Sequence, residues 1–250
     1  ESNHCSCNPD ESWPKHGSIE FDKIALRYRE QDDLVLKHIS LNIKPHEKVM
    51  IIGRTGSGKT SLTNALFRLR ELESGSIKID GMDISQLDLT VLRQGISLIP
   101  QDPILLTGSL RQSLDQDLQF TDAEIWRALK LAHMDAKIES LPMRLDTEIL
   151  EQASNFSQGE KQLLCLARSL LKNKHLLVLD ECTANVDMET SKMIQDTIRN
   201  EFQQCTVLCI AHRLDTAMDY DKILVLDGGK VKEFDSPQNL LKNKDSTFTQ

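Results

Sequence analysis

Long apolar runs and an excess of basic residues are both absent from this sequence. The longest apolar stretches, such as Leu176–Leu179, have the length of a buried strand and fall far short of the roughly 20 residues that a membrane-spanning helix needs. There are 30 lysines and arginines against 38 aspartates and glutamates, which gives a net charge of −8. A nucleic-acid surface usually has a basic footprint, so nucleic acid is not an expected partner.

Cysteine is sparse and unpaired in the sequence. None of the six cysteines belongs to a C-x2-C pair of the kind that binds zinc, so we expect reduced thiols. No metal site is expected at His4, Cys5 and Cys7, which lie in a polar tail. This lead from Glu1 to Pro14 has no starting methionine and no signal-peptide pattern, and it is interpreted as a linker cut from a longer polypeptide.

Glycine is scarce too, with 11 in 250 residues, yet three of them fall in the phosphate loop, Gly53 to Thr60. This G-x4-G-K-T segment lies between the apolar runs Val49–Ile52 and Leu62–Phe67. It predicts a strand, a glycine-rich turn and a helix start, an arrangement that holds nucleotide phosphates. Backbone N–H groups would surround the β-phosphate, the Lys59 ammonium would reach the β- and γ-oxygens, and the Thr60 hydroxyl would ligate Mg²⁺. The predicted nucleotide-binding residues here are Gly53, Arg54, Thr55, Gly56, Ser57, Gly58, Lys59, Thr60 and Ser61.

Apolar periodicity along the rest of the chain predicts an α/β fold. Antiparallel strands of a small β subdomain are expected at 17–21, 24–28, 34–43 and 75–81. Helical spacing from about 102 to 172, with Thr121 and Ser157 as N-caps, predicts a helical insertion. Short apolar runs at 175–179, 206–210 and 222–226, with a polar helix over 187–202, are typical of a parallel sheet with crossover helices.

Two carboxylates follow one of these buried strands. Leu176–Leu179 leads directly into Asp180 and Glu181, and ligand sites in open α/β sheets lie at the carboxyl ends of strands. Asp180 is therefore predicted to hold Mg²⁺ through its water shell, and Glu181 to polarise a water for attack on the γ-phosphate. The pair alone would fit a solvated acidic strand end equally well, and the phosphate loop upstream favours the catalytic interpretation.

Together these residues resemble the nucleotide-binding domain of ABC transporters, over about 18–235. The resemblance implies ATP and Mg²⁺ as ligands and a RecA-like P-loop NTPase core with an antiparallel β subdomain and an α-helical subdomain. Gln101 matches the Q-loop glutamine, which in the family ligates Mg²⁺ and senses the transmembrane part. His212 matches the switch histidine that contacts the γ-phosphate, and 184–187 lies at the D-loop. Tyr28 is placed like the aromatic residue that stacks on adenine.

The resemblance also implies domain boundaries. Residues 1–17 would be a linker, 18–240 the nucleotide-binding domain and 241–250 a tail. Within the domain, the β subdomain would take about 18–48 and 70–85, the helical subdomain about 102–172, and the RecA-like core the rest.

A second half-site is implied by the family signature LSGGQ, which reaches across a dimer to the γ-phosphate held by the other subunit. The corresponding segment here is Phe156-Ser157-Gln158-Gly159-Glu160. Ser157 and Gly159 match, as an N-cap and a residue close to phosphate. Phe156, Gln158 and Glu160 depart from the family pattern. Glu160 adds a negative charge near the expected phosphate, which would oppose binding if its carboxylate points inward.

The amino-acid sequences of several segments are similar to those in the second nucleotide-binding domain of the multidrug-resistance-protein (C) subfamily. The signature segment is similar to that of the short members of this subfamily. In that subfamily the two sites are unequal, and the second domain's signature faces the degenerate one. The implied active site is thus composite, with the first nucleotide-binding domain as a head-to-tail partner. Its catalytic residues from this chain would be Lys59, Gln101, Glu181 and His212, and its metal-binding residues Thr60, Gln101 and Asp180. Transmembrane domains of the same polypeptide, which bind a small-molecule substrate, would hold the domain at the cytoplasmic face of a membrane.

Three functions are compatible with these features. The first is ATP hydrolysis that drives export of organic anions, conjugates or drugs. The second is a regulatory nucleotide sensor that gates a channel or partner with little turnover. Glu181 and His212 favour hydrolysis, whereas Glu160 and the altered segment 151–154 favour slow turnover. A soluble ABC ATPase acting on DNA or ribosomes is disfavoured by the acidic charge.

Overall fold

The computed structural model describes residues 9–10, 12–211, 216–243 and 246–248. These form two compact units. Unit 1 takes the described residues within Glu1–Ser97, His175–Asp180 and Gln204–Gln250, and unit 2 those within Leu98–Lys174 and Glu181–Gln203. No helix among the described residues is long and apolar enough to cross a membrane.

Unit 1 is built mainly of strands. Its strands are β1 (Ile19–Leu26), β2 (Leu36–Ile43), β3 (Lys48–Ile52), β4 (Ser74–Ile79), β5 (Met82–Asp83), β9 (Leu176–Asp180), β10 (Thr206–Ile210), β11 (Lys222–Asp227) and β12 (Lys230–Asp235). Its helices are α1 (Lys59–Leu66), α2 (Leu89–Gly95) and α8 (Pro237–Lys242), with 3-10 turns η1 (Ile84–Gln86) and η4 (Ala217–Asp219). The chain passes between the units in β6 (Ser97–Ile99).

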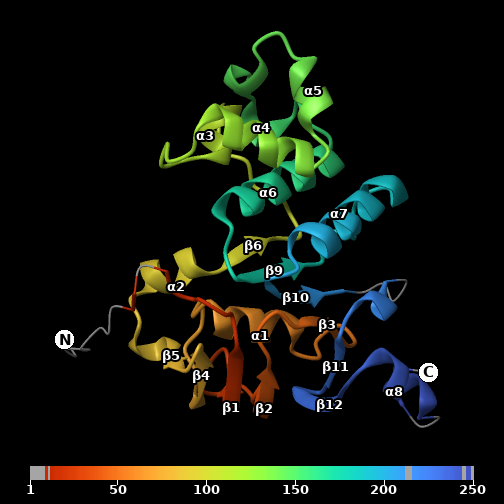
Figure 1. The fold of residues 1–250 in the computed structure, drawn as a ribbon. Coiled ribbons are helices and arrows are strands. Elements are labelled where there is room, and N and C mark those ends of the chain that lie inside the picture. The colour runs from red at the N-terminus through yellow and green to blue at the C-terminus, as the bar shows by residue number, and fades with distance from the viewer. Residues whose placement is uncertain (1–8, 11, 212–215, 244–245, 249–250) are drawn as a thin grey trace. The chain divides into compact units, whose positions relative to one another are not determined.

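The antiparallel sheet of unit 1 has the strand order β2-β1-β4-β5, and its strands lie side by side in Figure 1. Ile19 of β1 is paired with Ile43 of β2 and with Ile79 of β4. The segments 17–21 and 24–28, predicted as two strands, form the single strand β1. The register shifts after Phe21, where Lys23 has a φ of 46°, so a bulge interrupts the alternation that suggested two strands. Tyr28 lies beyond the end of β1.

The second sheet has the order β12-β11-β3-β10-β9-β6, in which β11, β3, β10 and β9 are parallel. These four strands are near-continuous apolar runs, as expected for strands covered on both faces. Asp180 of β9 is in register with Ile210 of β10, which is in register with Ile51 of β3. The carboxyl ends of β3 and β9 therefore lie at the same edge of the sheet.

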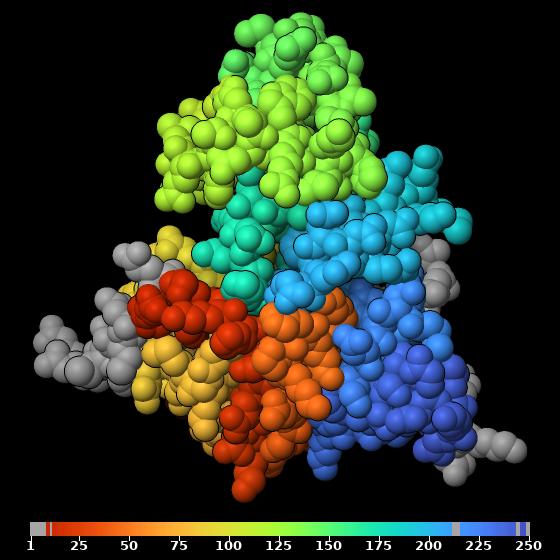
Figure 2. Space-filling view, viewed as in Figure 1, coloured from red at the N-terminus to blue at the C-terminus, as the bar shows by residue number. Residues whose placement is uncertain are grey.

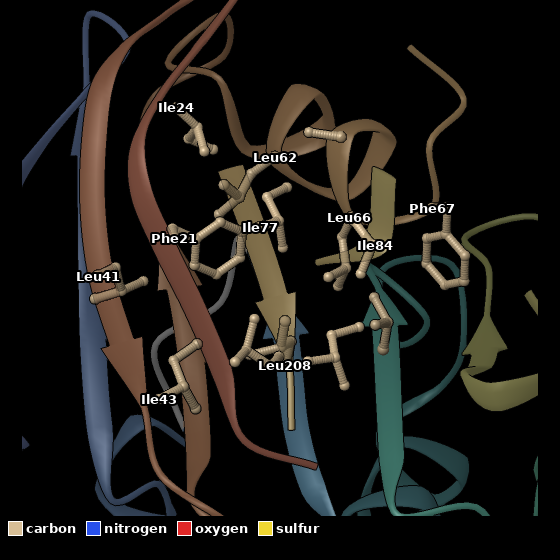
Figure 3. Close-up of a cluster of buried hydrophobic side chains, with 14 of the residues drawn as sticks. Phe21, Ile24, Leu41, Ile43, Leu62, Leu66, Phe67, Ile77, Ile84 and Leu208 are labelled. Carbon is tan, nitrogen blue, oxygen red and sulfur yellow. The ribbon is translucent and has the colours of Figure 1, made fainter. Parts of the chain in front are cut away.

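The hydrophobic core of unit 1 combines residues from both sheets and from α1. Phe21 of β1, Ile43 of β2 and Ile77 of β4 are at most 2% exposed. Figure 3 shows them in one cluster with Leu62 of α1 and Leu208 of β10. The helix that follows the phosphate loop is thus anchored in the core, and so is the strand that precedes the loop.

Unit 2 is largely helical. Its elements are β7 (Gly108–Ser109), α3 (Leu110–Leu114), α4 (Asp122–Leu131), α5 (Asp135–Glu139), η2 (Arg144–Asp146), β8 (Glu148–Ile149), η3 (Glu151–Ala153), α6 (Gln158–Lys172) and α7 (Met188–Glu201). Helix α6 packs against α4 and α7 (Figure 1). Thr121 and Ser157 are the N-caps of α4 and α6, as predicted, and each forms a capping box. The α/β class predicted from the sequence, with an antiparallel sheet and a helical part, is confirmed.

The segment before β1 is fastened to unit 1 by one carboxylate. Asp80 accepts hydrogen bonds from the backbone N–H groups of Lys15, His16, Gly17 and Ser18, at 2.8 to 3.2 Å. Nearby, the Trp13 indole N–H donates to the Ile79 carbonyl at 3.4 Å, and the Trp13 side chain is 8% exposed. The N-terminal segment therefore ends in an ordered strap, Trp13–Ser18, that contacts unit 1 beside β4.

Candidate nucleotide-binding site

The phosphate loop connects the end of β3 at Ile52 with the start of α1 at Lys59. Gly53 has a φ of 157°, and a Cβ atom there would lie 2.4 Å from the Leu226 carbonyl oxygen. Gly58 is the N-cap of α1 with a φ of 109°, a conformation that L side chains rarely adopt. Side chains at these two positions would therefore break the turn that presents the loop N–H groups.

Lys59 is buried inside this turn. Its ammonium donates to the carbonyls of Gly53 at 2.7 Å and Arg54 at 3.2 Å, and the residue is 6% exposed. Ser57 is 3% exposed, and its Oγ has no hydrogen-bond partner in the described part of the chain. A buried hydroxyl without a partner costs free energy, so an anion that accepted from it would be stabilised. The loop thus offers a cation, an unused hydroxyl and the amino end of α1 to a phosphate.

The remaining loop residues lie on the outside of the turn. Arg54, Thr55, Gly56 and Thr60 are exposed, and a Cβ built on Gly56 would meet no atom within 4 Å. Ser61 is buried, and its hydroxyl is 3.0 Å from the Tyr28 hydroxyl. Thr60 is thus exposed at the start of α1, whereas Ser61 connects the helix to Tyr28.

Tyr28 is fixed to α1 through its hydroxyl and remains open at its ring. Asn64 donates to the Tyr28 hydroxyl at 3.2 Å, in addition to the contact with Ser61. The Arg70 guanidinium lies over the ring, 5.5 Å from its centroid, and Tyr28 is 38% exposed. A cation over an aromatic ring is attracted by the ring's quadrupole, so Arg70 restrains the ring plane. Asn64 and Arg70 were not predicted from the sequence, because neither belongs to a motif.

Asp180 lies at the same sheet edge as the phosphate loop. It is the last residue of β9, and its register partner across β10 aligns with Ile51, two residues before the loop. Unit 1 therefore brings together Tyr28, Gly53–Ser61 and Asp180. The predicted switch residue, His212, lies outside the described residues.

Glu181 begins the part of unit 2 that follows β9. Its φ of 49° is left-handed, so its side chain leaves the direction that a continued strand would give it. Its carbonyl accepts from the Ala184 N–H at 2.9 Å, which closes a turn before α7. Asp187 caps α7, and the hydrogen bonds from Thr190 lower the pKa of Asp187 below its usual value.

Gln101 is positioned by a residue that sequence reasoning missed. Its side chain is exposed, and its carbonyl accepts from the side-chain amide of Gln162 at 2.9 Å. Gln162 also donates to the Pro100 carbonyl at 3.1 Å and is itself 2% exposed. A glutamine among the buried positions of α6 is the signal that could have identified it, because buried amides need hydrogen-bond partners.

The signature segment, Phe156–Glu160, starts α6. Ser157 is exposed, and its hydroxyl accepts from the Glu160 N–H at 3.2 Å. Gly159 is buried, and a Cβ atom there would lie 3.1 Å from Thr190 of α7, so close helix packing already requires this glycine. The Glu160 carboxylate turns back to the Ser157 N–H and to Lys137. Partial burial would raise the pKa of Glu160, but the Ser157 N–H and Lys137 outweigh this and hold the pKa below its usual value.

Comparison with known proteins identifies the class. The model of the ABC transporter family matches residues 36–184, and the chain belongs to this family. Its fold is the α/β fold predicted for it, with a RecA-like P-loop NTPase core, an antiparallel β subdomain and an α-helical subdomain. Membership makes the chain an ATP-binding domain of the ATPase class.

Within the family, the chain is similar to subfamily C. It is 52% identical over 240 residues to ATP-binding cassette sub-family C member 2 of Rattus norvegicus, which covers 96% of this chain and 16% of the relative. It is 51% identical over 244 residues to ATP-binding cassette sub-family C member 4 of Mus musculus, covering 98% and 18%. A solved bacterial Atm1-family ABC exporter with ATP bound matches with a TM-score of 0.87 and 34% identity, covering 94% of this chain and 41% of that chain. The chain thus spans less than a fifth of these curated relatives.

Proposed function

We propose that this domain binds Mg-ATP and hydrolyses it to power export of organic anions, conjugates or drugs through transmembrane domains of the same polypeptide. The observation that carries the proposal is the phosphate loop, with Lys59 buried in it, at the same sheet edge as Asp180. The structurally similar bacterial Atm1-family protein is itself an exporter, which favours this function over a regulatory nucleotide sensor. The domain would then lie at the cytoplasmic face of a membrane.

The residues of the site fit the two ligands. The Lys59 ammonium suits a phosphate, and so does the Ser57 hydroxyl, which has no partner among the described residues. The exposed ring of Tyr28 suits the adenine face. Thr60, Gln101 and Asp180 supply oxygen atoms, which Mg²⁺ prefers, and Mg²⁺ would neutralise charge on the β- and γ-phosphates. The remaining positions of the loop, Gly53 to Gly58 and Ser61, would line the phosphates.

The catalytic roles follow from the match between these positions and the motifs of the family. Glu181 would act as general base toward the attacking water, and Gln101 and His212 would orient the water and the γ-phosphate. Ser157 and Gly159 would serve the other nucleotide, held by a first nucleotide-binding domain in a head-to-tail pair. In this arrangement the chain is the second nucleotide-binding domain of a short subfamily C protein, with its domain over 18–240.

Replacement of the base tests the proposal. In the intact protein that contains this chain, Glu181→Gln should bind Mg-ATP about as tightly as the wild type. It should lose turnover by roughly 10²-fold or more, because the amide cannot accept the proton. Glu189→Gln, on the exposed first turn of α7, is the matched control and should keep wild-type turnover. Binding is measured by calorimetry and turnover by phosphate release. Wild-type turnover in Glu181→Gln would contradict the assignment.

A further inference from the structure

The Glu160 carboxylate is held by two donors in unit 2, one for each of its oxygen atoms. Oε2 accepts from the Ser157 N–H at 2.8 Å, which closes the capping box of α6. Oε1 forms an ion pair with the Lys137 ammonium at 2.9 Å. The Glu160 side chain is 24% exposed and the Lys137 side chain 43%, so solvent screens the pair only in part.

Lys137 is presented to Glu160 by a short, well-anchored helix. It lies in the middle of α5, and its neighbour Ile138 is fully buried. Figure 2 draws the green segment that includes α5 at the surface of unit 2. The Lys137 side chain therefore starts from an anchored helix and is partly exposed where it pairs with Glu160.

The capping box does not need this ion pair. A glutamine at the third helical position accepts from the N-cap N–H as a glutamate does, so the cap would form with either side chain and with no lysine. What the lysine changes is the charge at the amino end of α6. Without it, a full negative charge would stand within one helical turn of Ser157, where the proposed function places a second nucleotide's phosphate.

We propose that Lys137 is a positioning residue that compensates Glu160 and so keeps the acidic signature segment usable by the partner domain's nucleotide. This inference rests on the proposed function. It reverses the expectation that Glu160 by itself weakens the signature, because the folded chain places the Lys137 ammonium against the Glu160 carboxylate. The pair would act on nucleotide affinity more than on the chemical step, since it touches no reacting atom.

A double-mutant cycle in the intact protein that contains this chain tests the pair. The variants are Lys137→Met, which keeps the apolar stem and removes the charge, Glu160→Gln, which keeps the capping box, and their combination. Lys130→Met, on the exposed last turn of α4, is the matched control. The measurements are the ATP binding isotherm, KM and kcat of ATP hydrolysis, and the thermal unfolding midpoint.

Lys137→Met should raise KM and the ATP concentration for half-saturation by about tenfold, as expected for one uncompensated charge near a phosphate. Its kcat should stay within about twofold, and its unfolding midpoint should match that of Lys130→Met. In the Glu160→Gln background the same substitution should change KM by less than about twofold. An unchanged KM in Lys137→Met, or an equal rise in both backgrounds, would overturn the proposal. If the wild type binds ATP without turnover, the proposed function fails. The role of the Lys137–Glu160 pair is then tested by comparing the ATP binding isotherms of the variants alone.

Discussion

The side-chain amide of Gln162, in the middle of α6, donates a 2.9 Å hydrogen bond to the backbone carbonyl of Gln101. The residue that starts the predicted Q-loop is thereby tied to the helix that begins with the signature segment. The second hydrogen bond of this amide goes to Pro100, so two successive carbonyls are held by one side chain. A shift of α6 would therefore move Gln101 as well.

Gln162→Leu should slow ATP turnover by about tenfold or more while leaving ATP affinity near wild type, because small misplacements of positioning groups are costly in the transition state. The free energy of unfolding should fall by only about 1 kcal/mol. Two hydrogen bonds are lost, but the buried Gln162 Oε1, which has no partner within the described residues, is removed with them. Steady-state kinetics and urea unfolding measure both effects.

The control for this substitution is Gln86→Leu, at an exposed position of η1. It makes the same chemical change away from Gln101 and should leave kcat unaltered. If Gln162→Leu had wild-type kcat, the tie between α6 and Gln101 would have no role in turnover.

Removal of the Tyr28 ring should weaken ATP binding. Tyr28→Ala should lose about 1 to 3 kcal/mol of binding free energy if the ring stacks on adenine. Tyr28→Phe is the matched control, since it keeps the ring and Arg70 above it and removes only the hydroxyl contacts with Ser61 and Asn64. Tyr28→Phe should lose much less binding free energy than Tyr28→Ala. Equal affinity of Tyr28→Ala and wild type in calorimetry would leave Tyr28 with a packing role only.

These positions illustrate what the sequence could and could not predict. The phosphate loop and its flanking elements were predictable because glycine spacing, an apolar strand and a helix start are local signals. The parallel strands were predictable as well, since strands buried on both faces are continuous apolar runs. The bulge at Lys23 was not, because a register shift depends on pairing with β2 and β4 and leaves no local pattern.

The side-chain partners at the site were the least predictable features. Lys137 and Glu160 are 23 positions apart, and only the fold of unit 2 brings their charges together. Gln162 and Gln101 are likewise distant in sequence. Glu160 alone suggested a weakened signature, and its counter-ion became visible only in the fold. The sign of an electrostatic effect depends on such partners, which sequence spacing does not reveal.

The isolated chain should be a monomer with very low ATPase activity. Self-pairing would place its own signature segment, Phe156–Glu160, against its own phosphate loop, whereas the proposed pair uses the signature of a different domain. Sedimentation velocity with Mg-ATP should therefore show a single species of 28.3 kDa. Strong hydrolysis that rises with the square of protein concentration would contradict the asymmetric arrangement.

Asp80 should stabilise the fold in a pH-dependent manner through the strap Trp13–Ser18. Partial burial alone would raise the pKa of Asp80, but hydrogen bonds from His16, Ser18 and Gly17 outweigh it and lower the pKa below the usual value. A carboxyl group whose pKa is lower in the folded state stabilises that state above its unfolded pKa, near 3.9 for aspartate, and the contribution is lost as the pH falls through the folded pKa. The contribution of Asp80 should thus be complete at pH 7 and fade below about pH 4.

Asp80→Asn removes the charge, and asparagine tolerates the left-handed φ of 49° at this position. It also replaces one carboxylate oxygen, which accepts at least two of the strap's hydrogen bonds, by an NH2 group that cannot accept. At pH 7 the variant should lose about 2 kcal/mol of unfolding free energy, as some charge-assisted hydrogen bonds become neutral and others lose their acceptor. The charge-dependent part of this difference should shrink as the pH is lowered toward 3, because Asp80 then takes up a proton in the unfolded chain before it does so in the fold. Asp32→Asn, at an exposed turn, should show no such difference at any pH. A constant deficit of Asp80→Asn from pH 7 to pH 3 in urea unfolding would mean that the number of accepting oxygens, and not their charge, fastens the strap.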